Sequence, residues 1–231
     1  MTLFNIKIIA LLTMVIDHFG VFIFPDNIYF RLIGRLSFPL FAWAIANGAI
    51  YTKNINKYLL RLFTLAIISQ IPYQLLFNLW GIPESGLNIL FTLSLGLLGI
   101  VLIKNTGNIL IKFLIAFFLS LVAVLIKCDY GAFGVLSIII FYSFYKNRIK
   151  TGLSYAFLVI VFYVFPVFGN KIIGNVINVS YLNILELFST LSLFIVFSYN
   201  GKIGYRLKYL FYIFYPAHLL LFYLLKLFVL R

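Results

Sequence analysis

Long apolar runs alternate with short polar stretches along the whole chain. A membrane-spanning helix needs about 20 consecutive, mostly apolar residues, within a range of roughly 17–25. Nine runs come close to that length, so the pattern predicts an all-α polytopic membrane protein with about nine transmembrane helices. The fourth and sixth runs are short, which fits a tilted, broken or re-entrant helix. We place the nine spans at Leu3–Phe24, Tyr29–Ile50, Tyr58–Leu79, Asn88–Ile103, Ile109–Lys127, Gly131–Tyr145, Gly152–Phe168, Tyr181–Ser198 and Leu207–Phe228.

The composition supports a membrane protein and excludes a soluble domain. Of the 231 residues, 64% are hydrophobic and 10% are charged, whereas a soluble domain carries about 25% charged residues. No linker, low-complexity segment or repeat divides the sequence, so residues 1–231 are expected to form a single integral-membrane domain. The first apolar run has no small-residue cleavage site, and we expect it to remain as a spanning helix.

Basic residues are unevenly distributed between alternate connections. Nine Lys or Arg residues lie in the connections at 51–57, 104–108, 146–151 and 199–208, against one, Lys171, in those at 25–28, 80–87, 128–130 and 169–180. By the positive-inside rule the first group faces the cytoplasm. The N-terminus is then cytoplasmic, and the protein is a multi-pass protein of the cell membrane. The net charge of +13 reflects these loops and contact with the lipid bilayer, and no nucleic-acid partner is expected.

Ionisable residues interrupt the first apolar run, "KIIALLTMVIDHFG". Lys7 and His18 are eleven positions apart, which is about three helical turns, so they share one face about 16 Å apart along the axis. Ionisable residues inside a membrane are functional by default. A lysine near a helix end also reaches the interface for purely structural reasons. Asp17 points about 100° away from His18, so we expect it to pair with another helix.

The second run supplies candidate partners for Asp17. Arg31 and Arg35 are four residues apart and share one helix face. Arginines within the membrane are costly without a counter-charge, and Asp17 is the nearest acid at similar depth. Glu186, inside the eighth run, also needs a partner. Asp129 lies in a predicted turn.

Uncharged polar residues recur at the predicted outer depth of the third and fourth runs. Gln70 and Gln74 lie on one face, and Asn88 and Thr92 are four residues apart. Such side chains often join helices to one another. Their shared depth with the acids and arginines favours a polar vestibule instead. At the cytoplasmic end, Lys57 and Arg61 form a basic stripe, for which contact with lipid headgroups is the alternative.

The second histidine, His218, follows Pro216 in the last apolar run. Proline removes a backbone hydrogen bond within a helix and frees carbonyl groups. His218 is therefore either a catalytic group or a structural residue that compensates for this lost bond. Two histidines and the lone Cys128 do not form a zinc site, and we expect no metal.

Five blocks of sequence resemble a known family, the TraX family, which is named for an integral-membrane pilin N-acetyltransferase that uses acetyl-CoA. The resemblance covers most of the chain and is weakest across 104–206. The wider superfamily of integral-membrane acyltransferases typically carries a basic residue, ten intervening residues and a histidine in the first span. Lys7 and His18 match this spacing, although Arg is usual at the first position. The five blocks are "LFNIKIIALLTMVIDHFGVFIFP", "RLIGRLSFPLFAWAIANG", "YLLRLFTLAIISQIPY", "NILFTLSLGL" and "KYLFYIFYPAHLLLF".

The resemblance implies acetyl transfer from cytoplasmic acetyl-CoA to an amine or hydroxyl acceptor. On that basis His18 is the expected general base, with Asp17 and His218 as further catalytic residues. The expected ligands of the coenzyme phosphates are Lys7, Lys57 and Arg61.

The acceptor is expected at the outer side and is a peptide, a protein such as pilin, or a glycan. The polar vestibule that receives it comprises Arg31, Arg35, Gln70, Gln74, Asn88, Thr92, Asp129 and Glu186. A small transporter or channel is the alternative, because buried charges and a Pro-interrupted helix also occur in secondary carriers. The absence of a sequence repeat and the short chain count against it.

Overall fold

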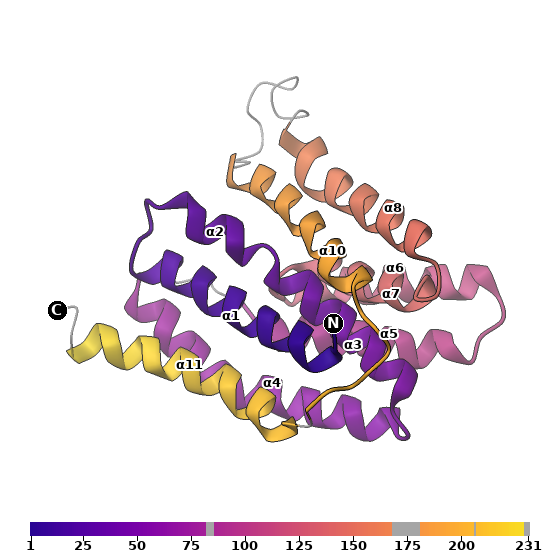
Figure 1. Cartoon of the computed structure of the whole chain (residues 1–231), viewed down its shortest axis with the longest axis horizontal. Helices are drawn as coiled ribbons and strands as arrows, with labels where there is room; N and C mark the ends of the chain where they lie inside the picture. The colour runs from indigo at the N-terminus through magenta and orange to yellow at the C-terminus, as the bar shows by residue number, and fades with distance from the viewer. Residues whose placement is uncertain (82–85, 168–180, 206, 229–231) are drawn as a thin grey trace. The chain divides into compact units, whose positions relative to one another are not determined.

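The computed structural model describes residues 1–81, 86–167, 181–205 and 207–228, and these residues are predominantly helical (Figure 1). The predicted all-α class is therefore confirmed. The elements in chain order are α1 (Leu3–Phe22), α2 (Ile28–Gly34), α3 (Ser37–Tyr51), α4 (Ile55–Leu79), α5 (Ile89–Lys104), α6 (Ile109–Leu125), α7 (Gly131–Ser143), α8 (Arg148–Val159), η1 (Ile160–Val164), η2 (Tyr181–Leu191), α10 (Ser192–Phe197) and α11 (Lys208–Phe228).

Within the described residues, five helical segments are long and apolar enough to cross a membrane. These segments support an integral-membrane protein. Four further apolar helices are shorter, including the predicted fourth and sixth spans, α5 with 16 residues and α7 with 13. Lys171, the basic residue assigned to an outer connection, and Phe168, the predicted end of the seventh span, lie outside the described residues. The five long segments are Leu3–Phe22, Ile28–Tyr51, Ile55–Leu79, Arg148–Val167 and Leu210–Phe228.

The chain divides into two compact units. Unit 1 comprises Met1–Asn47 and Ile140–Gly204, and unit 2 comprises Gly48–Ile139 and Tyr205–Arg231. The interpretation of residues 1–231 as one functional domain stays a prediction, because compactness of each unit does not decide whether the two share one function.

Asparagine residues start many of the helices. In each case the Asn side chain accepts a hydrogen bond from a backbone N–H two or three residues later, which satisfies one of the unpaired donors of the first turn. The connections are therefore short and sharply defined by sequence. The capped helices are α2 (Asn27), α4 (Asn54), α5 (Asn88), α6 (Asn108) and α8 (Asn147).

In unit 1 the predicted continuous helix Tyr29–Ile50 is interrupted, which corrects the sequence prediction. Helix α2 ends at Gly34 and α3 begins at Ser37. Pro39 fits the interruption, because a proline cannot donate to the carbonyl four residues earlier, that of Arg35, and it is well accommodated in the first turn of the new helix. The two pieces together still have the length of a spanning segment.

Helices α1 and α2 approach closely because both carry glycine at the contact. A Cβ atom added at Gly20 would press on Phe30, and one added at Gly34 would overlap the Asp17 carboxylate. Ser37 adds a link by donating a hydrogen bond to the Ala10 carbonyl at 2.9 Å. The interruption after Gly34 is thus packed against α1.

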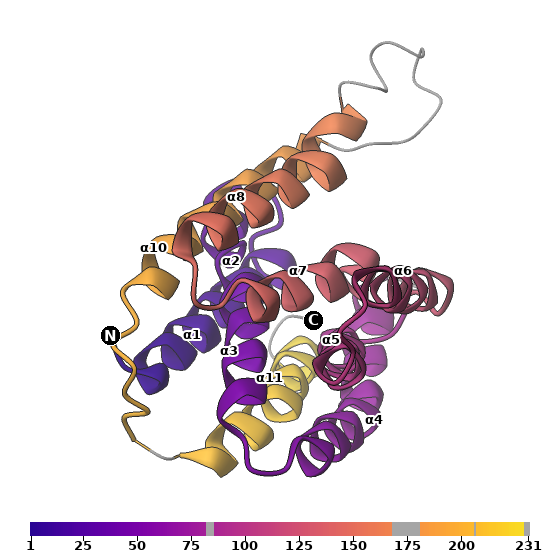
Figure 2. The ribbon, with the colours of Figure 1, turned by 90° about the vertical axis from the view of Figure 1, so that its right-hand side faces the viewer.

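The second half of unit 1 is a pair of helical rods that lie side by side in Figures 1 and 2, α8 with η1 and η2 with α10. Element η2 is a 3-10 helix of 11 residues, much longer than the three or four residues usual for this conformation. Residues three apart eclipse each other on such a helix. Glu186, Ser189 and Ser192 therefore form one buried polar row.

In unit 2, α4 packs against α5 and α11 (Figure 2). Helix α5 begins level with the middle of α4, because the Asn88 amide donates to the Ala66 carbonyl at 2.8 Å. The α4–α5 and α6–α7 connections pair there through two backbone hydrogen bonds, from Leu87 to Lys127 and from Asp129 to Leu87, each 2.9 Å. At about 1.5 Å per residue, α5 is about 24 Å long, short of the roughly 30 Å hydrocarbon thickness.

Helix α11 runs from Lys208 to Phe228 without a break, with Pro216 inside it. Its far end lies beside the end of α4, where the Lys226 ammonium sits 4.3 Å from the centre of the Trp80 ring. Pro216 removes a single backbone donor and does not end the helix.

Candidate functional site

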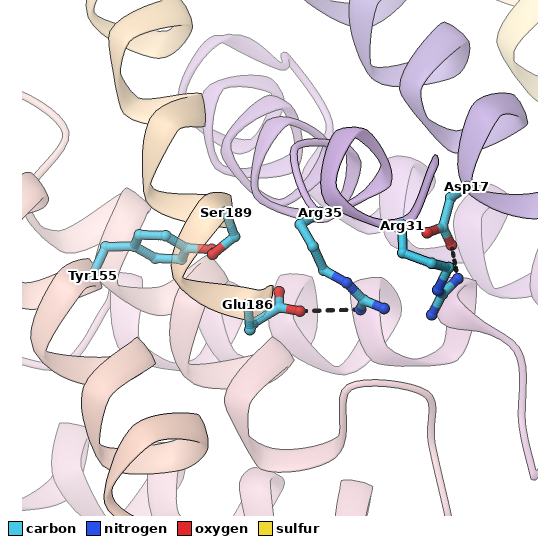
Figure 3. Close-up of polar contacts among 6 residues, drawn as sticks. All are labelled: Asp17, Arg31, Arg35, Tyr155, Glu186 and Ser189. Atoms are coloured by element: carbon cyan, nitrogen blue, oxygen red, sulfur yellow. Dashed lines mark hydrogen bonds and ion pairs between the residues drawn. The ribbon is translucent and has the colours of Figure 1, made fainter. Parts of the chain in front are cut away.

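An ion pair joins α1 to α2 in unit 1. Arg31 Nη1 lies 2.7 Å from Asp17 Oδ2, and both side chains are largely buried (Figure 3). The glycine at position 34 allows the carboxylate to sit against the α2 backbone. This is the pairing that the sequence predicted for Asp17.

A second ion pair joins the α2–α3 interruption to η2. Arg35 Nη1 lies 3.0 Å from Glu186 Oε2 (Figure 3), and Glu186 is 1% exposed. The partner that Glu186 requires is therefore Arg35, which the sequence analysis had associated with Asp17. In Figure 3 the two arginines lie between the two acids, so each arginine has its own counter-charge within one charged group.

His18 lies next to this charged group. It is half-buried on α1, its ring centre is 5.9 Å from that of Phe22, and the positive charge of Arg31 acts on the imidazole. Helix α1 is continuous from Leu3 to Phe22, so Lys7 and His18 keep the three-turn separation on one face. Unit 1 thus brings together His18, Asp17 and Arg31, with Lys7 about 16 Å away along the same helix.

Two buried polar residues of unit 1, Tyr155 and Ser189, were not predicted from the sequence. The Tyr155 hydroxyl on α8 is 3.0 Å from the Ser189 hydroxyl on η2, and both side chains are fully buried (Figure 3). Ser189 follows Glu186 by three positions. The spacing in "ELFSTLS" was the available signal, because polar residues at a period of three mark one face of a 3-10 helix.

Of the polar residues predicted in unit 2, some form hydrogen bonds between segments and others are exposed. Asn88 donates to Gln70 Oε1 at 2.7 Å, and Gln70 donates to the Gly86 carbonyl at 2.9 Å. These contacts match the alternative interpretation, in which polar side chains join helices. Gln74, one turn further along α4, is exposed.

A second candidate group surrounds Asp129, at the paired connections of unit 2. The Thr92 hydroxyl donates to the Asp129 carbonyl oxygen, and the half-buried Asp129 acts electrostatically on the buried tyrosines Tyr73 and Tyr215. The turn is strained, with φ of 52° at Lys127, in the left-handed region that most residues avoid.

His218 lies beside the Asp129 group. Its ring centre is 5.4 Å from that of Tyr215, and its Nδ1 is 3.0 Å from the Phe214 carbonyl oxygen. The carbonyl deprived of a donor by Pro216 belongs to Tyr212, four residues earlier. This contact is with a different carbonyl, and whether His218 is catalytic or structural stays a prediction.

The predicted residues thus fall into two groups. His18, Asp17, Lys7, Arg31, Arg35 and Glu186 belong to unit 1, whereas His218, Lys57, Arg61, Gln70, Gln74, Asn88, Thr92 and Asp129 belong to unit 2. Lys57 and Arg61 are exposed on the first two turns of α4. A shared site for both histidines, and one for Lys7 with the basic stripe, stay predictions.

The apolar helices and buried charge pairs place this chain among integral-membrane helical proteins with a polar interior. The model of the TraX family, described as TraX protein, matches residues 3–226, and the chain belongs to that family. The resemblance noted from the sequence is confirmed. A relative from Dichelobacter nodosus, "Probable fimbrial assembly protein FimC, serogroup H1", is 28% identical over 231 residues, covering 94% of this chain and 93% of that protein. No solved structure matches the chain.

Proposed function

We propose that this protein is a membrane-embedded acetyltransferase that moves an acetyl group from cytoplasmic acetyl-CoA to an amine of a peptide or protein at the outer side. The observation that carries this proposal is the position of His18. It is an imidazole within a spanning helix, beside the Asp17–Arg31 ion pair and on one face with Lys7. Membership of the TraX family supports the chemistry.

The acceptor class follows from the relative. The Dichelobacter nodosus protein is named for fimbrial assembly, and we propose a fimbrial or pilin-like subunit as the acceptor. A hydroxyl acceptor uses the same base and the same donor.

The reaction balances with one base and one leaving group. The neutral amine nitrogen attacks the thioester carbonyl carbon, the nitrogen–carbon bond forms, and the carbon–sulfur bond breaks. His18 takes the amine proton, which is general base catalysis, and the coenzyme leaves as a thiolate that is then protonated. Asp17 and Arg31 act as positioning residues through their ion pair beside His18.

The proposed topology has nine passes. Helices α2 and α3 together form one pass, and so do η2 and α10, whereas α5, α6 and α7 each form one pass. Acetyl-CoA then meets the end of α1 that carries Lys7, and the acceptor meets the opposite end. Asp129 and the neighbouring tyrosines provide a carboxylate beside aromatic rings, a combination that attracts an ammonium group.

The test compares His18→Ala with Leu12→Ala in purified protein. Leu12 lies on the same helix and is 58% exposed, so its truncation controls for insertion. With acetyl-CoA and a peptide amine, we expect His18→Ala to lower the rate of free-thiol release by about 10²–10⁴-fold and Leu12→Ala to leave it unchanged. Near-normal turnover in His18→Ala, with acetylated peptide verified by mass spectrometry, rules out His18 as the base.

A further inference from the structure

A pocket of unit 1 lies apart from the two charge pairs. Its volume is about 120 Å³, and it opens where α3, the α7–α8 connection and the end of α10 meet. Its walls combine large rings with a guanidinium and a hydroxyl. The lining residues are Trp43, Phe141, Tyr145, Arg148, Thr151, Val196, Phe197 and Tyr199.

Aromatic rings form one wall of this pocket. The Trp43 ring is nearly parallel to that of Tyr145, with centres 6.2 Å apart and an interplanar angle of 16°, and it meets the Tyr199 ring edge-on at 5.0 Å. The Asn47 amide holds the Tyr145 hydroxyl at 2.6 Å. Trp43 is 4% exposed and backs this wall, so the accessible ring faces are those of the half-buried Tyr145 and Tyr199. A heteroaromatic base stacks on such faces, an interaction that tolerates any base.

Positive charge forms the rim. Arg148 lines the pocket and is the first residue of α8, a helix of 12 residues capped by Asn147. Lys146 and Lys150 are exposed on either side of it in sequence. A helix N-terminus favours anions, and a guanidinium binds phosphate through paired hydrogen bonds.

The pocket lies at the end of unit 1 from which α1 starts. Backbone hydrogen bonds tie the first residues of α1 to the segment after α10, from Leu3 to Lys202 at 2.9 Å and from Phe4 to Ile203 at 3.0 Å. That segment begins next to Tyr199, which lines the pocket. From this end, α1 leads past Lys7 toward His18.

We propose that this pocket takes the base of the adenosine 3′,5′-bisphosphate end of coenzyme A. The base lies on the Tyr145 and Tyr199 rings, which Trp43 supports from behind, and the phosphates lie outside the cavity at its rim, on the exposed Arg148. The identity of the ligand as coenzyme A rests on the proposed function. The rings favour a nucleotide over the headgroup of an anionic lipid, which supplies a phosphate but no base. The thioester arm then extends along α1 toward His18, and Lys7 lies on that path.

Trp43 provides a direct reporter of binding. The chain has two tryptophans, so Trp80→Phe, a change in unit 2, leaves Trp43 as the sole tryptophan, which is excited selectively over the tyrosines. We expect adenosine 3′,5′-bisphosphate to change its emission saturably and coenzyme A to compete. Phosphatidylglycerol vesicles added in place of the nucleotide are expected to leave the emission unchanged.

Variants locate the site. We expect Arg148→Ala to weaken nucleotide binding about tenfold or more, since a charged hydrogen bond is lost. Tyr199→Leu keeps apolar bulk while removing a stacking face, and a loss of about fivefold or more is expected. Lys104→Ala, which removes an exposed cation at the end of α5 in unit 2, is the matched control and should bind normally.

The outcomes separate this site from the proposed function. Saturable nucleotide binding that depends on Arg148, without any acetyl transfer, supports the pocket and contradicts the acetyltransferase. Acetyl transfer with an unchanged KM for acetyl-CoA in Arg148→Ala and Tyr199→Leu overturns the pocket and leaves the acetyltransferase standing. A response to phosphatidylglycerol and none to nucleotide assigns the pocket to lipid and overturns our proposal.

Discussion

At the scale of single residues, two ion pairs connect the helices of unit 1. Asp17 neutralises Arg31 and Glu186 neutralises Arg35, at 2.7 and 3.0 Å. An unpaired charge is costly in this environment, so each acid specifies where its helix lies. The same pairs give His18 a polar neighbour inside an apolar helix.

Removing one partner of the more deeply buried pair is expected to be severe. Arg35→Ala takes the guanidinium from Glu186, which is 1% exposed, and we expect the free energy of unfolding in detergent to fall by about 3–5 kcal/mol. Lys150→Ala, an exposed cation on α8, is the control and should change the stability by less than about 0.5 kcal/mol.

The double variant Arg35→Met with Glu186→Leu tests the physical reason. Replacing both charges with apolar groups of similar size removes the desolvation cost together with the attraction, so most of the lost stability should return. If the double variant is as unstable as Arg35→Ala, the loss arises from packing and not from the isolated acid.

At the scale of elements, η2 and the first residue of α10 carry three polar residues at a spacing of three. Residues three apart are offset by about 60° on an α-helix and stack directly on a 3-10 helix, so η2 aligns Glu186 with Ser189, and Ser192 follows at the start of α10. All three are buried in unit 1. This spacing places the three polar side chains on the protein side of η2 and α10.

The hydrogen bond between α8 and η2 can be measured by a double-mutant cycle. Tyr155→Phe and Ser189→Ala each remove one side of a 3.0 Å contact, and each should cost about 1 kcal/mol. Because they lose the same interaction, the double variant should show a coupling energy of about 0.5–1.5 kcal/mol. The measurement is equilibrium unfolding of the four proteins.

A neighbouring residue supplies the control for this cycle. The Thr190 hydroxyl donates within its own helix, to the Leu187 carbonyl at 2.6 Å, so Thr190→Ala combined with Tyr155→Phe should be additive. Additivity in the Tyr155 and Ser189 pair as well would show that the contact contributes nothing to stability.

At the scale of the whole molecule, the alternating basic connections predict which ends face the cytoplasm. The structure contributes short, Asn-capped turns between apolar helices, and these turns leave the charged connections exposed. The orientation of these connections relative to the membrane is tested on the protein in the cell membrane.

Cysteine labelling tests this topology. Cys128 is the sole cysteine, so Cys128→Ser provides a background without thiols. In that background, Asp26→Cys should react with an impermeant maleimide on intact cells, whereas Asn105→Cys should react only after permeabilisation. Both positions are exposed in short connections, which makes them matched. Labelling of position 105 on intact cells would reverse the orientation or change the number of passes.

The sequence by itself determined the membrane class, the helical content, the approximate helix boundaries and the pairing of Asp17 with an arginine. These features follow from local properties of the sequence: the length of each apolar run, the capping residues at its start, and the charged residues within it. The three-turn separation of Lys7 and His18 is equally local, because a continuous helix fixes it.

The tertiary structure alone decided which distant residues meet. Arg35 contacts Glu186 across 151 positions, and Tyr155 contacts Ser189 from another element, because the chain breaks before Pro39 and tightens in η2. The length of the apolar runs in the sequence predicts neither of these deviations from a regular α-helix. The aromatic pocket around Trp43 has the same origin. Its walls come from segments far apart in sequence, and packing, which satisfies volume and polar groups together, is what places them side by side.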